Sequence, residues 1–455
     1  MISRRELIAG VCAAAATAAV VPRAVAAPLV KIASSDMRGA IDAVAYTAPT
    51  SADAQSRKLQ AMIDAAARNN APLMLPPGTY RVSNLTLPDN TRIVGVAGAT
   101  RIVYGGDGHL MTAQNASRIE ISDIVVDGAN RWLADDVGAL LQFAGVDEVL
   151  IRNCEIAGSA RHAIQLERCG GRVDGNHLSG AADAGLYAVQ STDLTITNNR
   201  VEDCGNGGIL VHRWQKGEDG TVISGNRIAR IGARDGGTGE NGNGINVFRG
   251  GNVMVTNNHI ADCAFTAIRA NSASDVQIST NQCLRSGETA IFCEFEFEGA
   301  VVSGNLIDGA SNGISIANFD KGGRLASVTG NVVRNLSLSA PYAADGGFGI
   351  GISAEADTLI SGNVIENAPL WGLKLGWGPY MRNLVATGNI IRHAAVGCAV
   401  SVADGAGAAV ISDNLFEASS QGAIVAFLWD KPASADLADG STAYPHLTID
   451  RNRRA

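Results

Sequence analysis

Residues 221–228 read TVISGNRI, and the chain repeats this pattern many times. Each copy has two alternating apolar residues, two small or polar residues, an asparagine, and another apolar residue two positions later. The copies recur at intervals of about 23 to 38 residues, and self-similarity at such a period is the signature of a repeat architecture. The repeated asparagines are Asn176, Asn199, Asn226, Asn258, Asn281, Asn305, Asn331, Asn363, Asn389, Asn414 and Asn452.

The alternation around each asparagine predicts short strands with one buried face. A further strand follows about ten residues later, as in GILV (208–211) and GISI (313–316). Equivalent strands of successive coils would stack in parallel, ~4.8 Å apart. The asparagine then marks a corner, because it tolerates left-handed backbone and stacked amides can bond to one another. We therefore predict an all-β solenoid with three short strands per coil.

The N-terminal part has the features of a cap followed by the first coils. Residues 53–70 place apolar side chains on one helical face, and PLMLPPGTYRV (72–82) follows. This order resembles the right-handed parallel β-helix of pectate lyases and related exported proteins. The resemblance implies one β-helix domain over 51–455, with an N-terminal capping helix and first coils in 51–105 and a loop at 430–446. It does not define the activity, because one fold can host many functions.

Residues 1–26 resemble a bacterial twin-arginine signal peptide, with Arg4 and Arg5 before an apolar stretch and a small-residue site at its end. The apolar stretch is too short and too alanine-rich to span a membrane. We expect residues 27–50 to be a linker. The chain thus resembles a family of twin-arginine-translocated repeat proteins. This resemblance implies a partner in the twin-arginine export machinery, a periplasmic or secreted location, and no membrane span in the mature chain.

Charge and cysteine positions narrow the possibilities further. The formal net charge of −8 argues against nucleic acid held by bulk charge. The repeat register places Cys283 and Cys293 inward and Cys154 at an asparagine corner. Cys204 and Cys263 share a register two coils apart, ~9.6 Å by the strand spacing, which exceeds the ~7 Å limit for a disulfide. We expect buried free thiols in the mature chain.

Two coils carry long Gly-rich connections after their asparagine, at 229–243 and 334–348. Insertions are where solenoids usually carry function. The two insertions are four coil steps apart, ~19 Å at the strand spacing. They predict a groove wide enough for a few sugar residues. The alternative is that both are neutral surface loops.

The floor of this groove can be assigned from the outward-facing positions of the strands. For a uronate lyase or epimerase, an arginine or Ca²⁺ would neutralise the sugar carboxylate and a base would remove a proton. Arg269, Glu294 and His212 are the catalytic candidates. Alternatively, Arg213 and Arg249 could be ordinary solvated side chains, and Arg269 could form only an exposed ion pair with Glu294. The positions predicted to contact substrate are Arg213, Trp214, Asn246, Arg249, Asn271, Asn318 and Lys321.

Glu294 and Glu296 alternate in the segment CEFEFEG, so both are expected to point outward from one strand, ~6.8 Å apart. This separation fits an inverting glycosidase pair, which needs ~6.5–9.5 Å. The same carboxylates, with Asp320, could instead hold Ca²⁺. They could also be a solvated acidic strand end.

The sequence therefore predicts an exported β-helix protein that binds an acidic, uronate-containing polysaccharide between its two insertions. Whether it also cleaves or epimerises that polysaccharide is left open; as an enzyme, a lyase or epimerase is favoured over a glycoside hydrolase. The alternative is a non-catalytic envelope or periplasmic repeat protein that binds glycan or a partner. Aromatic stacking platforms for such binding are Trp214, Trp371, Trp377 and Tyr380.

Overall fold

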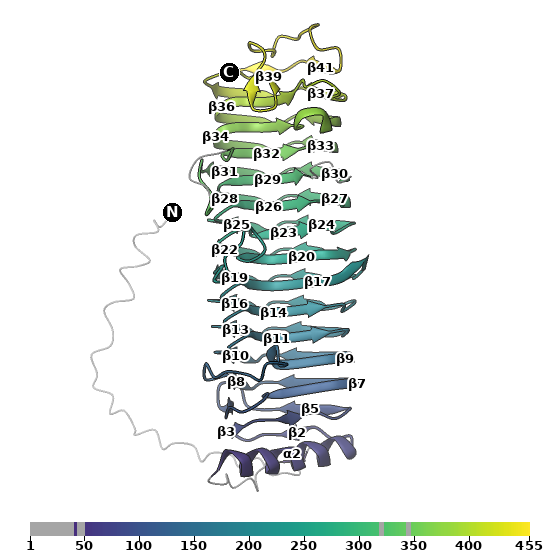
Figure 1. Ribbon diagram of the computed structural model, residues 1–455, viewed down its shortest axis with the longest axis vertical. Coiled ribbons are helices and arrows are strands. Elements are labelled where there is room, and N and C mark those ends of the chain that lie inside the picture. Colours follow the sequence, from purple (N-terminus) through teal and green to yellow (C-terminus); the bar gives the residue numbers. More distant parts are fainter. Residues whose placement is uncertain (1–40, 43–50, 318–322, 343–346) are drawn as a thin grey trace, which may run out of the picture. The chain divides into compact units, whose positions relative to one another are not determined.

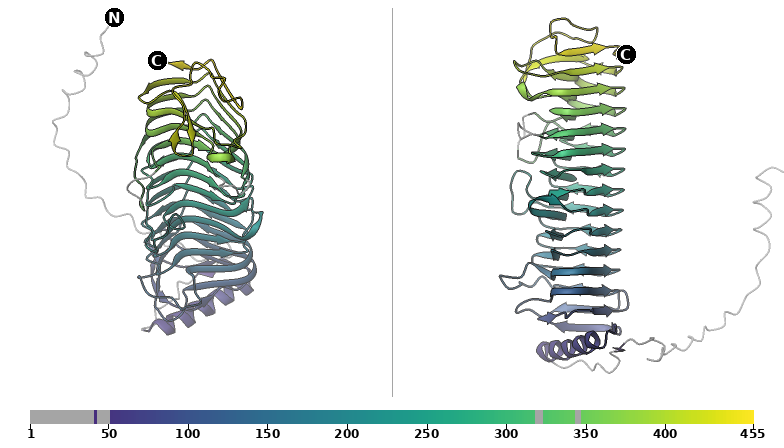
Figure 2. Two further views of the ribbon diagram at one scale, coloured as in Figure 1. Left: turned by 45° about the horizontal axis from the view of Figure 1, so that its top comes forward. Right: turned by 90° about the vertical axis from the view of Figure 1, so that its right-hand side faces the viewer.

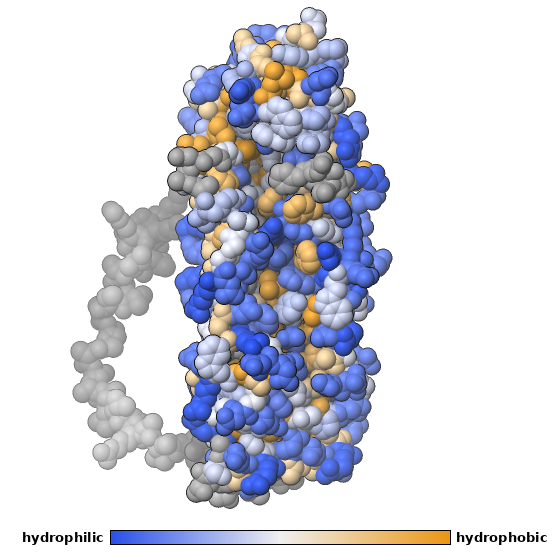
Figure 3. All heavy atoms as spheres, in the orientation of Figure 1, coloured by the Kyte–Doolittle hydropathy of each residue, from blue (hydrophilic) through white to orange (hydrophobic). Residues whose placement is uncertain are grey.

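The computed structural model describes residues 41–42, 51–317, 323–342 and 347–455. Coil follows coil along one axis, and the equivalent strands of successive coils stack in parallel (Figure 1). The predicted all-β parallel solenoid with three strands per coil is confirmed. Inward side chains form one continuous apolar core along the axis, whereas the face drawn in Figure 3 is predominantly hydrophilic.

The strands stack into three columns, here called sheets A, B and C. Sheet A follows each Gly-rich insertion and carries the pocket described below. Among the described residues, its last member is also one strand of the only antiparallel pair, β39 with β40. Its strands are β4 (Leu85–Thr86), the first part of β7 (Met111–Ser122), the first part of β9 (Ala139–Arg152), β11 (His162–Glu167), β14 (Ala184–Val189), β17 (Gly207–Glu218), β20 (Asn243–Gly251), β23 (Ile268–Asn271), β26 (Thr289–Glu294), β29 (Asn312–Ala317), β32 (Ile350–Ala354), the last part of β34 (Val364–Leu375), the last part of β36 (Ile390–Ser401) and β39 (Ile424–Leu428), with β40 (Lys431–Pro432) beside it.

Sheet B precedes the asparagine corner and sheet C follows it. Sheet B contains β1 (Ile41–Asp42), β2 (Leu73–Met74), β5 (Thr91–Val94), the last parts of β7 and β9, β12 (Gly171–Asp174), β15 (Thr195–Thr197), β18 (Val222–Ser224), β21 (Met254–Thr256), β24 (Val276–Ser279), β27 (Glu298–Ser303), β30 (Arg324–Thr329), β33 (Ala356–Ser361), β35 (Arg382–Thr387), β37 (Ala409–Ser412) and β41 (Leu447–Asp450). Sheet C contains β3 (Gly78–Val82), β6 (Thr100–Tyr104), β8 (Val125–Asp127), β10 (Glu155–Ala157), β13 (His177–Ser179), β16 (Arg200–Glu202), β19 (Arg227–Ile231), β22 (His259–Cys263), β25 (Gln282–Leu284), β28 (Leu306–Ala310), β31 (Val332–Leu336), the first parts of β34 and β36, β38 (Leu415–Ser419) and β42 (Arg453–Arg454).

The helix α2 (Ala52–Arg68) covers the first coils, as predicted. Its N-terminus is capped by Ser51, whose hydroxyl accepts a hydrogen bond from the backbone N–H of Ala54 at 3.3 Å. Leu59, Ile63 and Ala66 are buried against the core. The helix thereby shields the apolar end of the solenoid, which would otherwise be exposed to water.

The repeated asparagines form a buried ladder between sheets B and C. At Asn305, the backbone N–H and Nδ2 both donate to Oδ1 of Asn331, at 2.9 and 3.0 Å, and Nδ2 also donates to the carbonyl of Ile278 at 3.0 Å. The same bonds link successive members of the repeat from Asn176 to Asn452. One detail differs from the prediction, because the left-handed residue is the one before the asparagine, such as Gly304 with φ 64°.

The seven described cysteines are all buried and free, which confirms the prediction of no disulfide among them. Cys154 continues the ladder, since its backbone N–H donates to Oδ1 of Asn176 at 2.9 Å. Burial raises the pKa of these thiols; that of Cys293, for example, rises to about 12.

The predicted signal peptide at 1–26 and most of the predicted linker at 27–50 lie outside the described residues. The predicted loop at 430–446 contains the short strand β40. Within the described ranges, no helix is long and apolar enough to cross a membrane.

Candidate functional site

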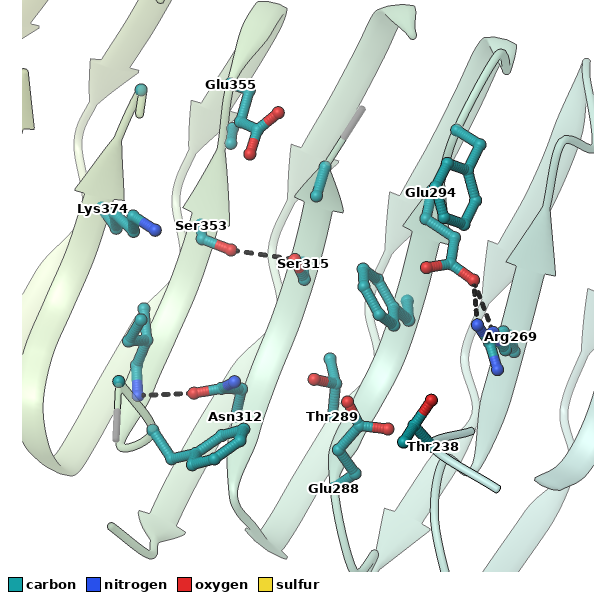
Figure 4. Close-up of a pocket in the computed structure, with 18 of the residues that line it drawn as sticks. Thr238, Arg269, Glu288, Thr289, Glu294, Asn312, Ser315, Ser353, Glu355 and Lys374 are labelled. Atoms are coloured by element: carbon teal, nitrogen blue, oxygen red, sulfur yellow. Dashed lines mark hydrogen bonds and ion pairs between the residues drawn. The ribbon is translucent and has the colours of Figure 1, made fainter. Parts of the chain in front are cut away.

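A pocket of about 350 Å³ lies on the outer face of sheet A, where both Gly-rich insertions reach it. Insertions project from one side of the solenoid at several levels (Figure 2, right). Thr238 from the first insertion and Tyr342 and Phe348 from the second line the pocket walls, and outward side chains of five strands form its floor. Figure 4 shows Thr238 at the wall and Ser315 and Ser353 on the floor.

The floor is one row of side chains in strict register. β23, β26, β29, β32 and β34 contribute one residue each, and each residue pairs with the next. The row spans four strand steps, ~19 Å. The hydroxyl of Ser353 donates to Ser315 Oγ at 3.0 Å, so the row has a charged residue at each end, with one aromatic ring and two hydroxyls between them. Its members are Arg269, Phe292, Ser315, Ser353 and Lys374.

The second insertion folds back toward the first. The ring of Tyr342 stacks on Phe265 with centroids 6.0 Å apart, and its hydroxyl donates to Glu288 Oε1 at 3.1 Å. Phe265 itself packs beside Gly242 of the first insertion. The two walls are therefore closer than the expected ~19 Å, and they make a partly enclosed pocket instead of an open groove.

Glu294 lies at one end of the pocket and is only 2% exposed. Arg269 Nε and Nη2 each lie 2.5 Å from its Oε1, and Asn271 Nδ2 donates to the same oxygen at 2.8 Å. Burial raises the pKa of Glu294, and the guanidinium of Arg269 and the amide of Asn271 partly offset this effect. Nη1 of Arg269 donates to the carbonyl of Gly239 in the first insertion, so Nε, Nη1 and Nη2 each have a partner.

Glu288 is the second buried carboxyl group, 6% exposed. Burial raises its pKa, and hydrogen bonding to Tyr342 opposes the shift. Burial and the neighbouring Glu288 raise the pKa of Tyr342 to about 12, so this phenol remains a donor. A Cβ on Gly239 would lie 2.6 Å from Arg269 Nη1 and 3.5 Å from Glu288 Oε2. Arg269 is therefore close to both carboxyl groups.

Lys374 occupies the opposite end of the row. Its Nζ lies 4.3 Å from the ring centroid of Trp377 and 5.8 Å from that of Trp371. Burial lowers the pKa of Lys374, and the negative charge of Glu355 opposes the shift. Both Lys374 and Glu355 line the pocket (Figure 4).

The pocket brings together some of the predicted residues. Arg269 and Glu294 line it, and Asn271 contacts Glu294. Arg269 donates to Glu294 and to the carbonyl of Gly239, and its predicted contact with a substrate carboxylate stays a prediction. Asn246 pairs with Arg269 in the neighbouring strand but is buried and does not line the pocket.

Other predicted residues lie outside the pocket, on the β17 and β20 coils. His212 packs between the rings of Tyr187 and Phe248, and burial lowers its pKa to about 4. Arg213 lies 3.5 Å from Asp219, and Arg249 donates to the backbone carbonyl of Trp214. The predicted Asn318, Asp320 and Lys321 lie outside the described residues.

The expected pairing of Glu294 and Glu296 on one strand is wrong. β26 ends at Glu294, and Phe295 has a left-handed backbone with φ 55°, which turns exposed Glu296 away from the strand alternation. The described residues contain no cluster of three His, Cys, Asp or Glu side chains suited to a metal ion. Asp320 of the predicted calcium site lies outside the described residues, so that site stays a prediction.

Glu288, Tyr342, Glu355 and Lys374 were not among the predicted site residues. Lys374 could have been found by applying the outward-position rule to GLKL (372–375), which is in register with the floor. Glu288 precedes its strand and Tyr342 lies within an insertion, so neither has a periodic signal. Glu355 follows the last residue of β32.

Solved structures with the same arrangement share little sequence with this chain. Bacteriophage phi29 gene product 12 is 14% identical with a TM-score of 0.53, covering 86% of this chain and 65% of that one. The Azotobacter vinelandii mannuronan C-5 epimerase AlgE4 A-module is 18% identical with a TM-score of 0.47, covering 67% of this chain and all of that one. At such identities the first likeness shows the fold alone.

No curated protein matches the sequence. A family model described as the right handed beta helix region matches residues 102–233 and 214–333, which together make up about half of the chain. The parallel coils, the stacked corner asparagines and this match agree. The chain belongs to the right-handed β-helix family.

Proposed function

We propose that this pocket binds a stretch of an acidic polysaccharide and hydrolyses a glycosidic bond at the end that holds Glu288 and Glu294. One observation carries the proposal: two buried carboxyl groups lie close to the same guanidinium and line the same pocket. Buried groups with shifted pKa values in a cleft are typical of catalytic sites. The half-buried lysine at the other end suits an anionic substituent of the polysaccharide.

The two carboxyl groups suit different steps. Glycoside hydrolysis uses one carboxylic acid to protonate the leaving oxygen and one carboxylate to activate water or attack the sugar. Glu288 suits the acid, because burial raises its pKa and favours its protonated form. Glu294 suits the carboxylate because, although burial raises its pKa, Arg269 and Asn271 partly offset this by stabilising its negative charge. Tyr342 positions Glu288 through its hydrogen bond.

Elimination or epimerisation is supported less well by this arrangement. Either reaction needs a positive group beside the reacting sugar to neutralise the uronate carboxylate. Arg269, the cation at the carboxyl end, is engaged by Glu294 and Gly239. Lys374 is three strand steps from β26, ~14 Å by the strand spacing, so it is placed to bind a different sugar of the chain.

The test is cleavage of a panel of uronate-containing polysaccharides by the purified protein. Product is followed both as new reducing ends and as ultraviolet absorbance of an unsaturated sugar. We expect new reducing ends without the absorbance. Glu288→Gln should lower the rate about 10²–10⁴-fold, the usual contribution of a general acid, and leave oligosaccharide affinity nearly unchanged. Glu296→Gln, outside the pocket, is the matched control and should keep the full rate.

Three outcomes would contradict hydrolysis. Absorbance of an unsaturated product would mean elimination. Binding without any cleavage would favour the non-catalytic glycan-binding alternative. Equal loss of rate in Glu288→Gln and Glu296→Gln would exclude Glu288 as the specific acid.

We also propose export of the protein through the twin-arginine route to the periplasm or beyond. The proposal rests on the Ser-Arg-Arg-x-Leu-Ile segment at residues 3–8 and the apolar stretch after it. Replacing Arg4 and Arg5 together by lysine should leave the protein in the cytoplasm of a bacterial host, as seen by cell fractionation. Unchanged export of this variant would contradict the proposal.

A further inference from the structure

Three aromatic side chains meet beyond the lysine end of the pocket. Trp377 and Tyr380 belong to the segment after β34, which includes the short 3₁₀ helix η3 (Gly378–Tyr380). Trp429 lies in the turn between β39 and β40. The ring centroid of Trp429 is 5.4 Å from that of Trp377 and 6.4 Å from that of Tyr380, and both contacts are edge-to-face. Two segments about 50 residues apart in sequence therefore build one surface.

Trp429 is held in place at a conformational cost. Its backbone is left-handed with φ 59°, a conformation that is rare and unfavourable for a bulky residue. Its ring packs directly on Gly378, where a Cβ would lie 2.4 Å from ring atoms. The hydroxyl of Ser401 fixes the same glycine by donating to its carbonyl at 2.7 Å.

Burial does not explain this fixed tryptophan, because Trp429 remains 45% exposed and Tyr380 remains 36% exposed. A rigid, exposed aromatic surface combines an apolar face with access to solvent. Such faces stack well on the apolar sides of ring-shaped ligands. Backbone strain at an exposed site is itself a reason to look for a binding function.

Lys374 connects this surface to the pocket. Lys374 and Gly376 line the main pocket, and both also line a shallow depression that includes Trp429 and Phe427. Trp377 lies against the ammonium group, with Nζ 4.3 Å from its ring centroid. On the next two coils the row continues with Ala399 and Val425, which are buried in an apolar cluster with Trp371 and Phe427.

We infer that Lys374, Trp377, Tyr380 and Trp429 form a separate subsite for one anionic sugar, whose ring stacks on the aromatic side chains and whose carboxylate or sulfate ester pairs with Lys374. The inference rests on the proposed function for the presence of a glycan in the pocket. It adds that the glycan lies along the solenoid axis, with this sugar several units from the bond near Glu288. The subsite selects the charge of the polysaccharide, and the carboxyl end performs the reaction.

The test measures binding to a protein that carries Glu288→Gln, so that no turnover disturbs the titration. The probes are a uronate tetrasaccharide, a sulfated neutral tetrasaccharide and an uncharged tetrasaccharide, titrated by tryptophan fluorescence and calorimetry. Lys374→Met should weaken the preferred anionic probe about 10-fold or more, the cost of a charge-assisted contact, and change the uncharged probe less than about twofold. Lys374→Arg should retain most of the affinity.

Trp429→Ala should weaken charged and uncharged probes by similar factors, because stacking does not depend on the sugar's charge. Trp429→Phe should recover part of the loss and separates stacking from misfolding, together with an unchanged melting temperature. Trp132→Ala is the matched control, since Trp132 is 81% exposed in a distant connection; it should leave all affinities unchanged. Preference for the uronate or the sulfated probe identifies the anion.

The subsite is overturned if Lys374→Met weakens charged and uncharged probes equally, or if Trp429→Ala has no effect on a probe that binds. Its failure can be told apart from that of the proposed hydrolysis. Lys374-dependent binding by a wild-type protein that cleaves nothing would sink hydrolysis and support the subsite. Cleavage that is insensitive to both Lys374→Met and Trp429→Ala would support hydrolysis and sink the subsite.

Discussion

The asparagine corner and the outer pocket are built on the same coils but follow opposite rules. At the corner, one residue type recurs once per coil and makes the same hydrogen bonds each time, as Asn281 and Asn305 do. In the pocket, equivalent positions of successive coils carry different residues, such as Arg269, Ser315 and Lys374. The scaffold is therefore encoded by repetition, and the candidate site by departures from it.

The electrostatics of the two regions also differ. The buried corner amides are neutral and bonded on both sides, so burial costs them little. Glu288, Glu294 and Lys374 are ionisable groups at the pocket, and burial shifts each pKa toward the neutral form. Such groups weaken the fold unless they are paired. The regular scaffold thus holds groups that would not stabilise it by themselves.

The largest expected effect is at the asparagine corner, where a single substitution tests the energetic role of the ladder. Asn305→Ala removes the acceptor for Asn281 and the donor to Ile278 and Asn331. We expect a loss of ~1–3 kcal/mol in the free energy of unfolding, as for a buried polar group left without its partner. Chemical denaturation measures this change. Gln277→Ala, at an exposed sheet B position, is the control, and a loss at Asn305 below ~0.3 kcal/mol would contradict the ladder's energetic role.

This contrast explains how much of the molecule could be predicted from its sequence. The strands, the corners, the buried cysteines and the capping helix each follow a periodic pattern that one chain reveals by itself. The close approach of the two insertions follows no such pattern. Tyr342, which contacts Phe265 and Glu288, lies in an insertion whose sequence has no periodicity. The sequence pattern located the two insertions but not how they close over the floor.

The outward side chains show a second limit. Alternation predicts which way a strand residue points, and it correctly placed Arg269 at the surface. It does not predict how deeply the ion pair of Arg269 and Glu294 is buried, or that Phe295 will end the alternation before Glu296. These outcomes depend on contacts between coils and on local backbone conformation. The same alternation predicts that Lys374 points outward, because it is in register with Ser353.

An ion cluster on sheet C, away from the pocket, should give a stability change of intermediate size. Glu202 accepts hydrogen bonds from Arg200 at 2.7 Å and Arg230 at 2.6 Å, and the ring of His177 lies 2.8 Å away. Chiefly through Arg200, these contacts lower the pKa of Glu202 to about 2. Because the pKa of Glu202 is lower in the folded state, its ionised carboxylate stabilises the fold at pH values above its ordinary pKa of 4.5. This stabilisation is lost as pH falls from about 4.5 toward 2.

We expect Glu202→Gln to lower stability by ~1–2 kcal/mol at pH 7, a figure reduced for the solvent exposure of the two arginines. The difference from the wild type should shrink as the pH is lowered through this window. Thermal melts between pH 7 and pH 3 measure it, with Glu296→Gln as the control. A difference that is independent of pH would show that the loss comes from packing instead of charge.

The smallest expected effect has the opposite sign and sharpens the comparison at the pocket itself. Burial raises the pKa of Glu288, so its protonated form is favoured in the folded state. Its contribution to stability is complete below the ordinary pKa of 4.5 and is lost as pH rises through the folded-state pKa.

Glu288→Gln imitates the protonated form and does not titrate. At pH 8 this variant should be equally stable or more stable by up to ~1 kcal/mol, with the advantage disappearing near pH 4. A change that removes the proposed general acid would then strengthen the fold, which is the stability–activity trade-off expected of a catalytic group and opposite to Asn305→Ala. If Glu288→Gln instead destabilises the protein equally at pH 4 and pH 8, Glu288 has a structural role like that of the corner asparagines, and the division between scaffold and site does not hold at this residue.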